Sequence, residues 1–219
     1  MHPPSTALIL TLSACFLLAA NAQAATEVSL SPLADAYVSN EYPHANYGEE
    51  GTLYVHAGSN TKRTYLMFDL GPVDHASISL ATLHLFFGQG GAQLPTVIDL
   101  HHVLSDGWTE SGLNWSNKPT YTVPPLATAS TQFGQAEVTW SLPAHLFTFD
   151  TDGRLSLLLK LQDEGISDTA TFFSKEATVH PAIPSYLTLA VPEPEIWMLM
   201  LAGMGLIAWR KPRNRQRCP

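Results

Sequence analysis

The sequence predicts an all-β protein in which residues 25–190 form one antiparallel β-sandwich. About a dozen short alternating or apolar runs follow one another in this body, and Gly, Pro, Asn and Asp separate them. No run shows the helical period over ten residues that a bundle would need. The 14 glycines and 16 prolines of the 219-residue chain also argue against a bundle. A body of about 165 residues is long enough to bury a sizeable core.

Ten runs give the expected strands in chain order. In the fifth of them, Leu83, Leu85 and Phe87 point to one face of the sheet, opposite Thr82 and His84. The ten ranges are Glu27–Leu30, Ala36–Val38, Thr52–His56, Thr64–Leu70, Ser77–Phe87, Val97–Val103, Glu137–Leu142, Leu155–Leu161, Thr171–Ser174 and Ser185–Ala190.

The eighth run has leucine at every second position from Leu155 to Leu161, so this face is predicted to lie in the core. Asp150-Thr151-Asp152-Gly153, directly before it, predicts a turn in which Gly153 supplies a positive φ. The same letters resemble a calcium loop, but the bidentate acid required further downstream is absent. We therefore interpret this segment as a turn.

The N-terminus has the layout of a secretory signal peptide over residues 1–24. A 14-residue apolar stretch at 7–20 is followed by Ala22-Gln23-Ala24, which matches a cleavage site. The alternative is lipoprotein processing, because Leu12-Ser13-Ala14-Cys15 is similar to a lipoprotein box. Cleavage of a signal peptide predicts export of the body, and lipoprotein processing predicts a lipid on Cys15.

The C-terminal segment, residues 191–219, combines a short motif, an apolar run and a basic tail. Pro192-Glu193-Pro194 precedes the uncharged residues 196–209, and five of the eleven basic residues follow. These features resemble the PEP-CTERM sorting signal. The resemblance implies that an exosortase recognises the tail, which crosses the inner membrane only transiently before it is removed. The alternative is a permanent single-pass anchor, for which fourteen helical residues are short.

Charge and cysteine content exclude several classes of function. All 19 acidic residues but only six of the eleven basic residues lie between positions 25 and 195. Such an acidic body repels phosphate backbones, so we expect no nucleic-acid partner. The two cysteines, Cys15 and Cys218, both lie outside the body. Disulfides, thiolate nucleophiles and Cys-ligated metals are therefore excluded there.

A series of motifs along the body resembles the DNRLRE domain, which is related to carbohydrate-binding module family 96 and the disaggregatase-related domains. The resemblance implies a jelly-roll-like sandwich that is non-catalytic and that, in some members, binds acidic polysaccharide. Lys175 stands where the family commonly has Arg. The motifs are Asp35–Val38, Asn46–Gly48, Leu53–Val55, Arg63–Leu70, Ile78–Leu85, Trp108–Pro119, Phe173–Ala177 and Pro184–Leu187.

The strongest candidate for ligand binding is the segment in which Trp108 and Trp115 flank Glu110 and Asn114. Exposed aromatic rings stack on sugar faces, and carboxylates and amides hydrogen-bond hydroxyls. The alternative is that both indoles close the end of the sandwich beneath a loop, with Glu110 capping a turn or pairing with a base.

A second aromatic cluster precedes a predicted strand, with Tyr47 as its candidate binding residue. Loops on a rigid scaffold are frequent binding sites, although Asn46-Tyr47-Gly48 also fits a plain turn. The cluster comprises Tyr37, Tyr42, His44, Asn46, Tyr47 and Tyr54.

Carboxylate groups of an acidic glycan would have to bind the few positive charges of the body. Lys62, Arg63 and Lys175 are three of these six. The alternative is that Arg63 forms an internal ion pair with Glu176 or Asp35.

The metal prediction is limited to a structural calcium ion bound by Asp35, Asn46 or other carboxylates. His101 and His102 are adjacent on a predicted strand and point to opposite faces, so they do not indicate a zinc site.

No pattern predicts catalysis. The carboxylate pairs Asp106/Glu110 and Asp163/Glu164 are near in sequence but lack any supporting motif for glycoside hydrolysis. We therefore expect no catalytic residue, and we expect that the protein is not an enzyme.

The sequence thus predicts an exported protein at the cell surface or in the extracellular matrix that binds extracellular polysaccharide without cleaving it. The alternative is a structural or protein-binding surface component without glycan affinity.

Overall fold

A computed structural model describes residues 25–71, 73–88, 95–132, 134–149, 152–178 and 183–192. Residues Thr26–Pro192 form one compact unit. The predicted signal peptide, its lipoprotein alternative at Cys15, and Glu193 and Pro194 of the predicted sorting motif lie outside the described residues. The N-terminal signal helix and the C-terminal hydrophobic helix that the sequence leads us to expect outside the domain also lie there. Pro192 ends the last strand. Among the described residues, no helix has the length and apolar character that crossing a membrane requires.

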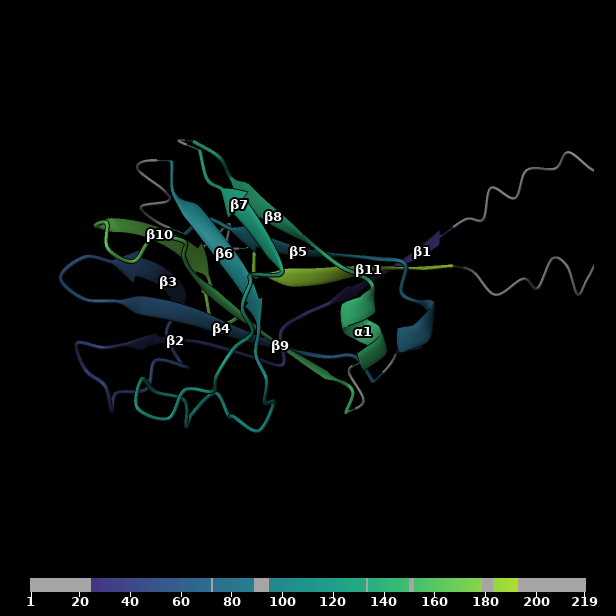
Figure 1. Ribbon diagram of the computed structural model, residues 1–219, viewed down its shortest axis with the longest axis horizontal. Coiled ribbons are helices and arrows are strands. Elements are labelled where there is room, and N and C mark those ends of the chain that lie inside the picture. Colours follow the sequence, from purple (N-terminus) through teal and green to yellow (C-terminus); the bar gives the residue numbers. More distant parts are fainter. Residues whose placement is uncertain are drawn as a thin grey trace, which may run out of the picture. The chain divides into compact units, whose positions relative to one another are not determined.

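Two antiparallel sheets form the fold, which confirms the predicted β-sandwich (Figure 1). The smaller sheet has the order β1 (Ala25–Leu30), β11 (Tyr186–Pro192), β5 (Leu80–Phe86) and β8 (Glu137–Leu142). The larger sheet has the order β10 (Asp168–Phe173), β3 (Thr52–Ala57), β4 (Lys62–Asp69), β9 (Arg154–Leu161), β6 (Val97–His102) and β7 (Ala127–Ser130), and β2 (Ala34–Ser39) also pairs with β4.

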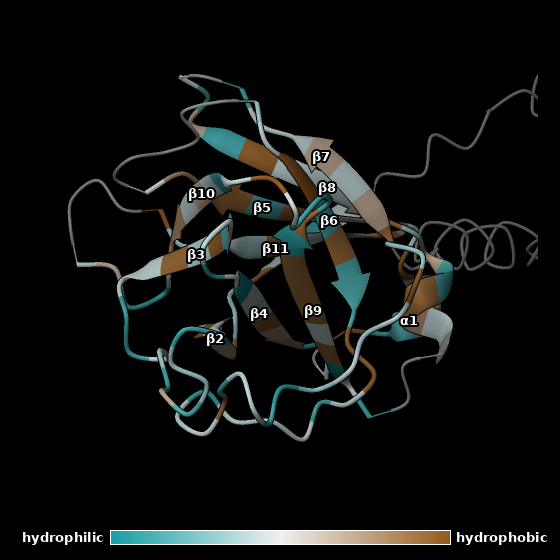
Figure 2. Cartoon of the chain, turned by 60° about the vertical axis from the view of Figure 1, so that its left-hand side comes forward, coloured by the Kyte–Doolittle hydropathy of each residue, from teal (hydrophilic) through white to brown (hydrophobic). Residues whose placement is uncertain are grey.

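The main core lies between the two sheets. Leu83 and Leu85 of β5 are fully buried there, and Thr82 and His84 lie half-buried on the opposite face, as the alternation predicts. The alternate leucines of β9 also join this core. Trp140 of β8 links the layers, because its indole N–H donates to the carbonyl of Ile98 in β6 at 3.2 Å. The apolar bands on facing strands are visible in Figure 2.

Some elements differ from the predicted ones. Residues His75–Ser77 form a 3-10 helix, η1, at the point where the fifth strand was expected to begin. The carboxylate of Asp74 accepts from the backbone N–H of Ala76 and caps this turn, which competes with strand extension. The strand β7 and the short helix α1 (His145–Phe149) were not predicted. The apolar face of β7 consists of only two small side chains, Ala127 and Ala129, which pack against the main core.

The outer face of the larger sheet carries a second apolar cluster. A loop of residues 104–126, here called the covering loop (teal in Figure 1), lies over it. Leu158 of β9 is therefore buried on the side of the strand opposite to the main core. The cluster consists of Ala36, Val38, Tyr65, Val103, Leu113 and Leu158, with Trp108, Trp115 and Tyr121 packed against it.

Candidate functional site

The covering loop is attached to the turn that precedes β3 through the Asn46 side chain. Its Nδ2 donates to the backbone carbonyls of Glu110 at 2.6 Å and Leu113 at 2.8 Å. Its Oδ1 accepts from the backbone N–H of Gly48 at 3.2 Å. Asn46 thus holds two remote loops together, and both groups of its carboxamide are engaged in this role.

Gly48 allows the two loops to approach closely. A Cβ atom at this position would lie 2.5 Å from the carbonyl oxygen of Glu110 and 2.7 Å from its Cγ. Real side chains do not occupy such positions without movement of the neighbouring backbone. The Asn46–Gly48 motif therefore forms a turn and also holds the covering loop in place.

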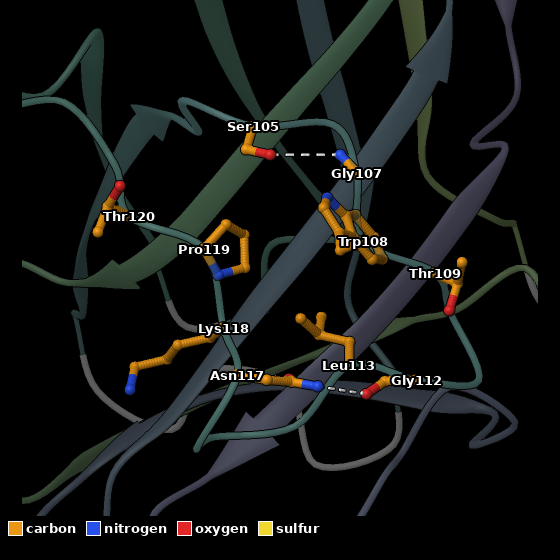
Figure 3. A pocket seen from close by; sticks show the side chains of 10 residues that line it. All are labelled: Ser105, Gly107, Trp108, Thr109, Gly112, Leu113, Asn117, Lys118, Pro119 and Thr120. Carbon is orange, nitrogen blue, oxygen red and sulfur yellow. Dashed lines mark hydrogen bonds between the residues drawn. The ribbon is translucent and has the colours of Figure 1, made fainter.

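The covering loop lines an open cavity of about 510 Å³ (Figure 3). Trp108 forms part of its wall, and its indole N–H donates to Ser156 Oγ at 3.0 Å. This bond and the packing of Trp108 against Tyr65 fix the ring in place. The lining residues are Ser105, Gly107, Trp108, Thr109, Gly112, Leu113, Asn117, Lys118, Pro119 and Thr120.

Trp115 is also half-buried but does not line this cavity. Two cations lie over its ring, with Lys118 Nζ at 4.0 Å and Arg63 Cζ at 5.0 Å from the centroid. Cations over an aromatic face are attracted by the ring quadrupole. The side chains of Lys118 and Arg63 therefore already cover part of the Trp115 ring.

Asn114 shapes the covering loop from within. Its Oδ1 accepts from the backbone N–H groups of Ser116 at 2.9 Å and Asn117 at 3.2 Å. Asn117 in turn donates from Nδ2 to the carbonyl of Gly112 at 2.8 Å. These bonds fix the wall of the cavity.

Arg63 makes its ion pair with a partner that the sequence did not indicate. It donates from Nε and Nη2 to the two carboxylate oxygens of Glu164, each at 2.8 Å. The expected alternatives, Glu176 and Asp35, instead lie in a network with Lys175. Arg63 and Lys175 both reach carboxylates of the protein itself.

Lys118 differs from these two bases. Its Nζ donates to the carbonyl of Trp115 at 2.8 Å, and no carboxylate of the described residues forms an ion pair with it. Burial, assisted by the nearby charge of Arg63, lowers the pKa of the Lys118 ammonium. Lys118 thus lines the cavity, while its Nζ turns toward Trp115 and forms no ion pair with a carboxylate of the described residues.

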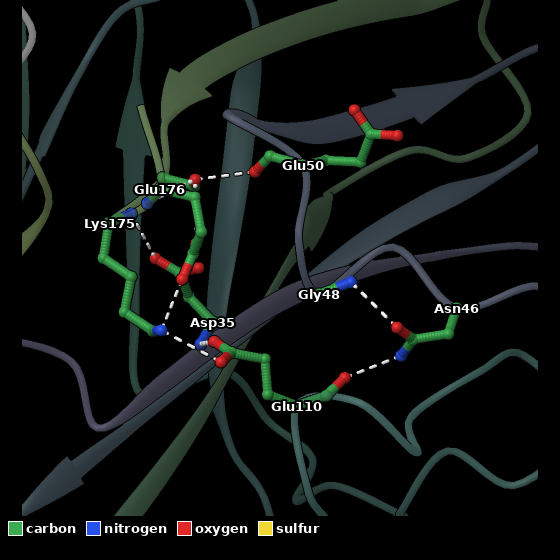
Figure 4. A network of polar contacts seen from close by, with 8 residues as sticks. Asp35, Asn46, Gly48, Glu50, Glu110, Lys175 and Glu176 are labelled. Atoms are coloured by element: carbon green, nitrogen blue, oxygen red, sulfur yellow. Dashed lines mark hydrogen bonds and ion pairs between the residues drawn. The ribbon is translucent and has the colours of Figure 1, made fainter. Parts of the chain in front are cut away.

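Three carboxylates, Asp35, Glu110 and Glu176, converge from three separate segments and are here called the acidic cluster (Figure 4). Lys175 Nζ donates to Glu110 Oε2 at 2.9 Å and also to Glu176 Oε1. The backbone N–H of Asp35 donates to Glu110 Oε1 at 2.8 Å, and the backbone N–H of Lys175 donates to Asp35 Oδ2 at 2.9 Å.

Burial has its largest effect in this cluster on the pKa of the Asp35 carboxyl. It raises the pKa of the Asp35 carboxyl to about 8, although the backbone N–H of Lys175 favours the charged form. Burial alone would lower the pKa of the Lys175 ammonium. The hydrogen bonds to Glu176 and Glu110 outweigh this effect and raise the pKa. The ammonium therefore stays charged between the two glutamates.

The tyrosine cluster stacks mainly on itself. The rings of Tyr37 and Tyr47 are parallel with centroids 4.3 Å apart, and Tyr54 meets Tyr37 edge-on at 5.1 Å. Lys62 Nζ lies 4.5 Å from the centroid of Tyr54. Tyr42 remains 59% exposed and is the accessible ring of this surface.

The remaining candidates have structural contacts. His101 is buried on β6, and its Nδ1 lies 2.8 Å from the carbonyl of Thr122. Of the pair Asp163/Glu164, Asp163 Oδ1 accepts from the N–H of Gly165, and Glu164 is held by its ion pair with Arg63.

Residues 26–186 match the model of carbohydrate-binding module family 96. This match covers almost the whole described body, including the covering loop, the acidic cluster and Gly48. No curated protein matches the chain.

Proposed function

Because the chain belongs to carbohydrate-binding module family 96, we propose that it binds an extracellular polysaccharide at the cavity of the covering loop without cleaving it. The observation that supports this site is the combination of a fixed indole with hydrogen-bonding groups in one depression. Trp108, Thr109 and Lys118 line the same cavity. Aromatic rings with adjacent polar groups suit the alternating apolar and hydroxylated surfaces of sugars.

The charge of the cavity supports an acidic glycan as the ligand. Lys118 lies on its wall and pairs with no carboxylate of the described residues. A uronate carboxylate would supply the missing partner by a charge-assisted hydrogen bond. Such a contact would make Lys118 the base that recognises an acidic glycan, because Arg63 and Lys175 are already paired with glutamates.

The terminal segments support a place of action outside the cell. A signal peptide at 1–24 would export the body, and the PEP-CTERM-like tail from 191 would be recognised by an exosortase at the inner membrane. The processed protein would then act as an adhesion or matrix component at the cell surface.

Retention of the purified protein on a panel of immobilised acidic and neutral polysaccharides tests this proposal. Ser105→Trp fills the cavity with a bulky ring, and Ser59→Trp adds the same ring to an exposed turn that does not line it. We expect retention by the wild type and by Ser59→Trp, and loss of retention in Ser105→Trp. Retention of Ser105→Trp at the wild-type level would reject the site.

Absence of retention on every glycan would favour the structural or protein-binding alternative. That alternative expects self-association or a protein partner in cross-linking, and behaviour that does not depend on the cavity. Release of reducing ends or unsaturated products from any glycan would contradict the non-catalytic role.

A further inference from the structure

The acidic cluster brings together three carboxylates that the sequence separates by up to 141 positions. One oxygen each of Asp35, Glu110 and Glu176 can be chosen so that all lie within 4.8 Å of one another. Two oxygens that bind one Ca²⁺ ion at about 2.4 Å lie at most about 4.8 Å apart. The spacing therefore allows all three carboxylates to share one such ion.

One oxygen of this cluster lacks a hydrogen-bonding partner. Asp35 has no exposed surface, and its Oδ1 receives no hydrogen bond from any described residue. Its other oxygen accepts the backbone N–H of Lys175. The Glu176 carboxylate lies beside this carboxyl group, and two carboxyl groups in contact need either a shared proton or a cation between them.

The charges of the cluster are also unbalanced. The single ammonium of Lys175 contacts Glu110 and Glu176, whereas only the backbone of Lys175 contacts the Asp35 carboxylate. Three carboxyl groups thus share a single ammonium, which does not contact Asp35. A divalent cation would supply the missing charge and a partner for the unpaired oxygen.

We propose that Asp35, Glu110 and Glu176 form a binding site for a divalent cation, with Ca²⁺ as the ion that fits this oxygen-only set. Ca²⁺ takes six to eight oxygen ligands with flexible geometry, so water completes the shell around three carboxylates. Mg²⁺ demands a stricter octahedral arrangement and binds more weakly here.

Lys175 competes with the ion for the same carboxylates. Its side chain is 27% exposed and long, so the ammonium can turn outward to solvent when the cation binds. The cluster therefore has two alternative positive occupants, the ammonium and the divalent ion.

The ion would join three segments of the fold. Asp35 belongs to β2, Glu110 to the covering loop and Glu176 to the turn after β10. Because Thr109 and Gly112 beside Glu110 line the cavity, the ion would also fix one side of the cavity. The proposed site exists independently of glycan binding.

Calcium titration of the chelator-treated protein tests the proposal, with calorimetry and the shift of Tm as readouts. We expect one Ca²⁺ per chain and a rise of Tm, with a smaller rise for Mg²⁺. Asp35→Asn and Glu110→Gln should abolish both effects. Asp74→Asn removes an exposed charge and keeps the cap of η1, so it should bind Ca²⁺ like the wild type.

Substitution of the competing base gives the sharper test. Lys175→Met should tighten Ca²⁺ binding by about tenfold, because it removes a positive charge from the site. In a closed network of internal ion pairs, the same substitution would only destabilise the fold. No Ca²⁺ binding by either the wild type or Lys175→Met, or binding that survives Asp35→Asn and Glu110→Gln, would overturn the proposal. Glycan retention in chelator is measured separately, so loss of one activity does not decide the other.

Discussion

The close approach of Gly48 to Glu110 gives a test of how the covering loop is held. In Gly48→Ala, the new Cβ would lie 2.5 Å from a backbone oxygen and 2.9 Å from a backbone carbon of Glu110. Neither atom is the end of a flexible side chain, so the covering loop must move away from the turn at residues 46–48. Such movement strains the hydrogen bonds from Asn46 to the covering loop.

The expected cost is about 1–3 kcal/mol of unfolding free energy, the usual range for an atom forced into a packed site. The matched control is Gly51→Ala in the same loop. Its Cβ would meet Ala177 Cα at 3.5 Å, an ordinary contact. Because alanine restricts the unfolded chain, this control should be neutral or stabilised by up to about 1 kcal/mol.

Urea denaturation followed by tryptophan fluorescence measures both variants, and Trp108 and Trp115 place two of the reporters in the covering loop. We also expect Gly48→Ala to lose glycan retention, since Thr109 and Gly112 near Glu110 line the cavity. Equal stability of the Gly48 and Gly51 variants would refute the view that this contact holds the loop.

Three further outcomes are expected. Lys118→Gln should weaken binding to a uronate polymer about tenfold in affinity electrophoresis, with neutral polymers and the control Lys62→Gln unaffected. Glu164→Gln should lower the unfolding free energy in urea by about 1–3 kcal/mol, because a bidentate charged pair is lost; an unchanged midpoint would contradict this. Burial lowers the pKa of His101 below its ordinary 6.5, so its contribution to stability is complete above about pH 6.5 and is lost as the pH falls toward the lowered pKa. His101→Gln should flatten this acid slope in urea titrations, and the similar shift of His102 should leave part of it.

Local pattern was sufficient to predict most of the strands. The alternate leucines of β9 face the main core as expected, because strand side chains alternate between the two faces of the sheet. The same rule could not predict that Leu158 is buried as well. Its burial depends on the covering loop, which packs on that strand from a distant part of the chain.

The partners of charged side chains were the least predictable part of the site. Arg63 pairs with Glu164, 101 positions away, although Glu176 and Asp35 were the expected partners. Asp35 was a predicted calcium ligand, but its neighbours in the structure are Glu110 and Glu176, whereas Asn46 holds the covering loop. A sequence shows which charges exist, but long side chains select partners by the register of strands and the path of loops.

The sequence by itself determined the all-β class, the thiol-free acidic body, and the motifs typical of its family, since these follow from composition and local periodicity. Only the tertiary structure decided that Trp108 borders a cavity, that Lys118 forms no ion pair with a described carboxylate, and that three carboxylates meet around Lys175. These features require segments remote in the chain to lie within a few ångströms of one another. Such proximity is set by sheet pairing and loop docking, on which local pattern carries no information.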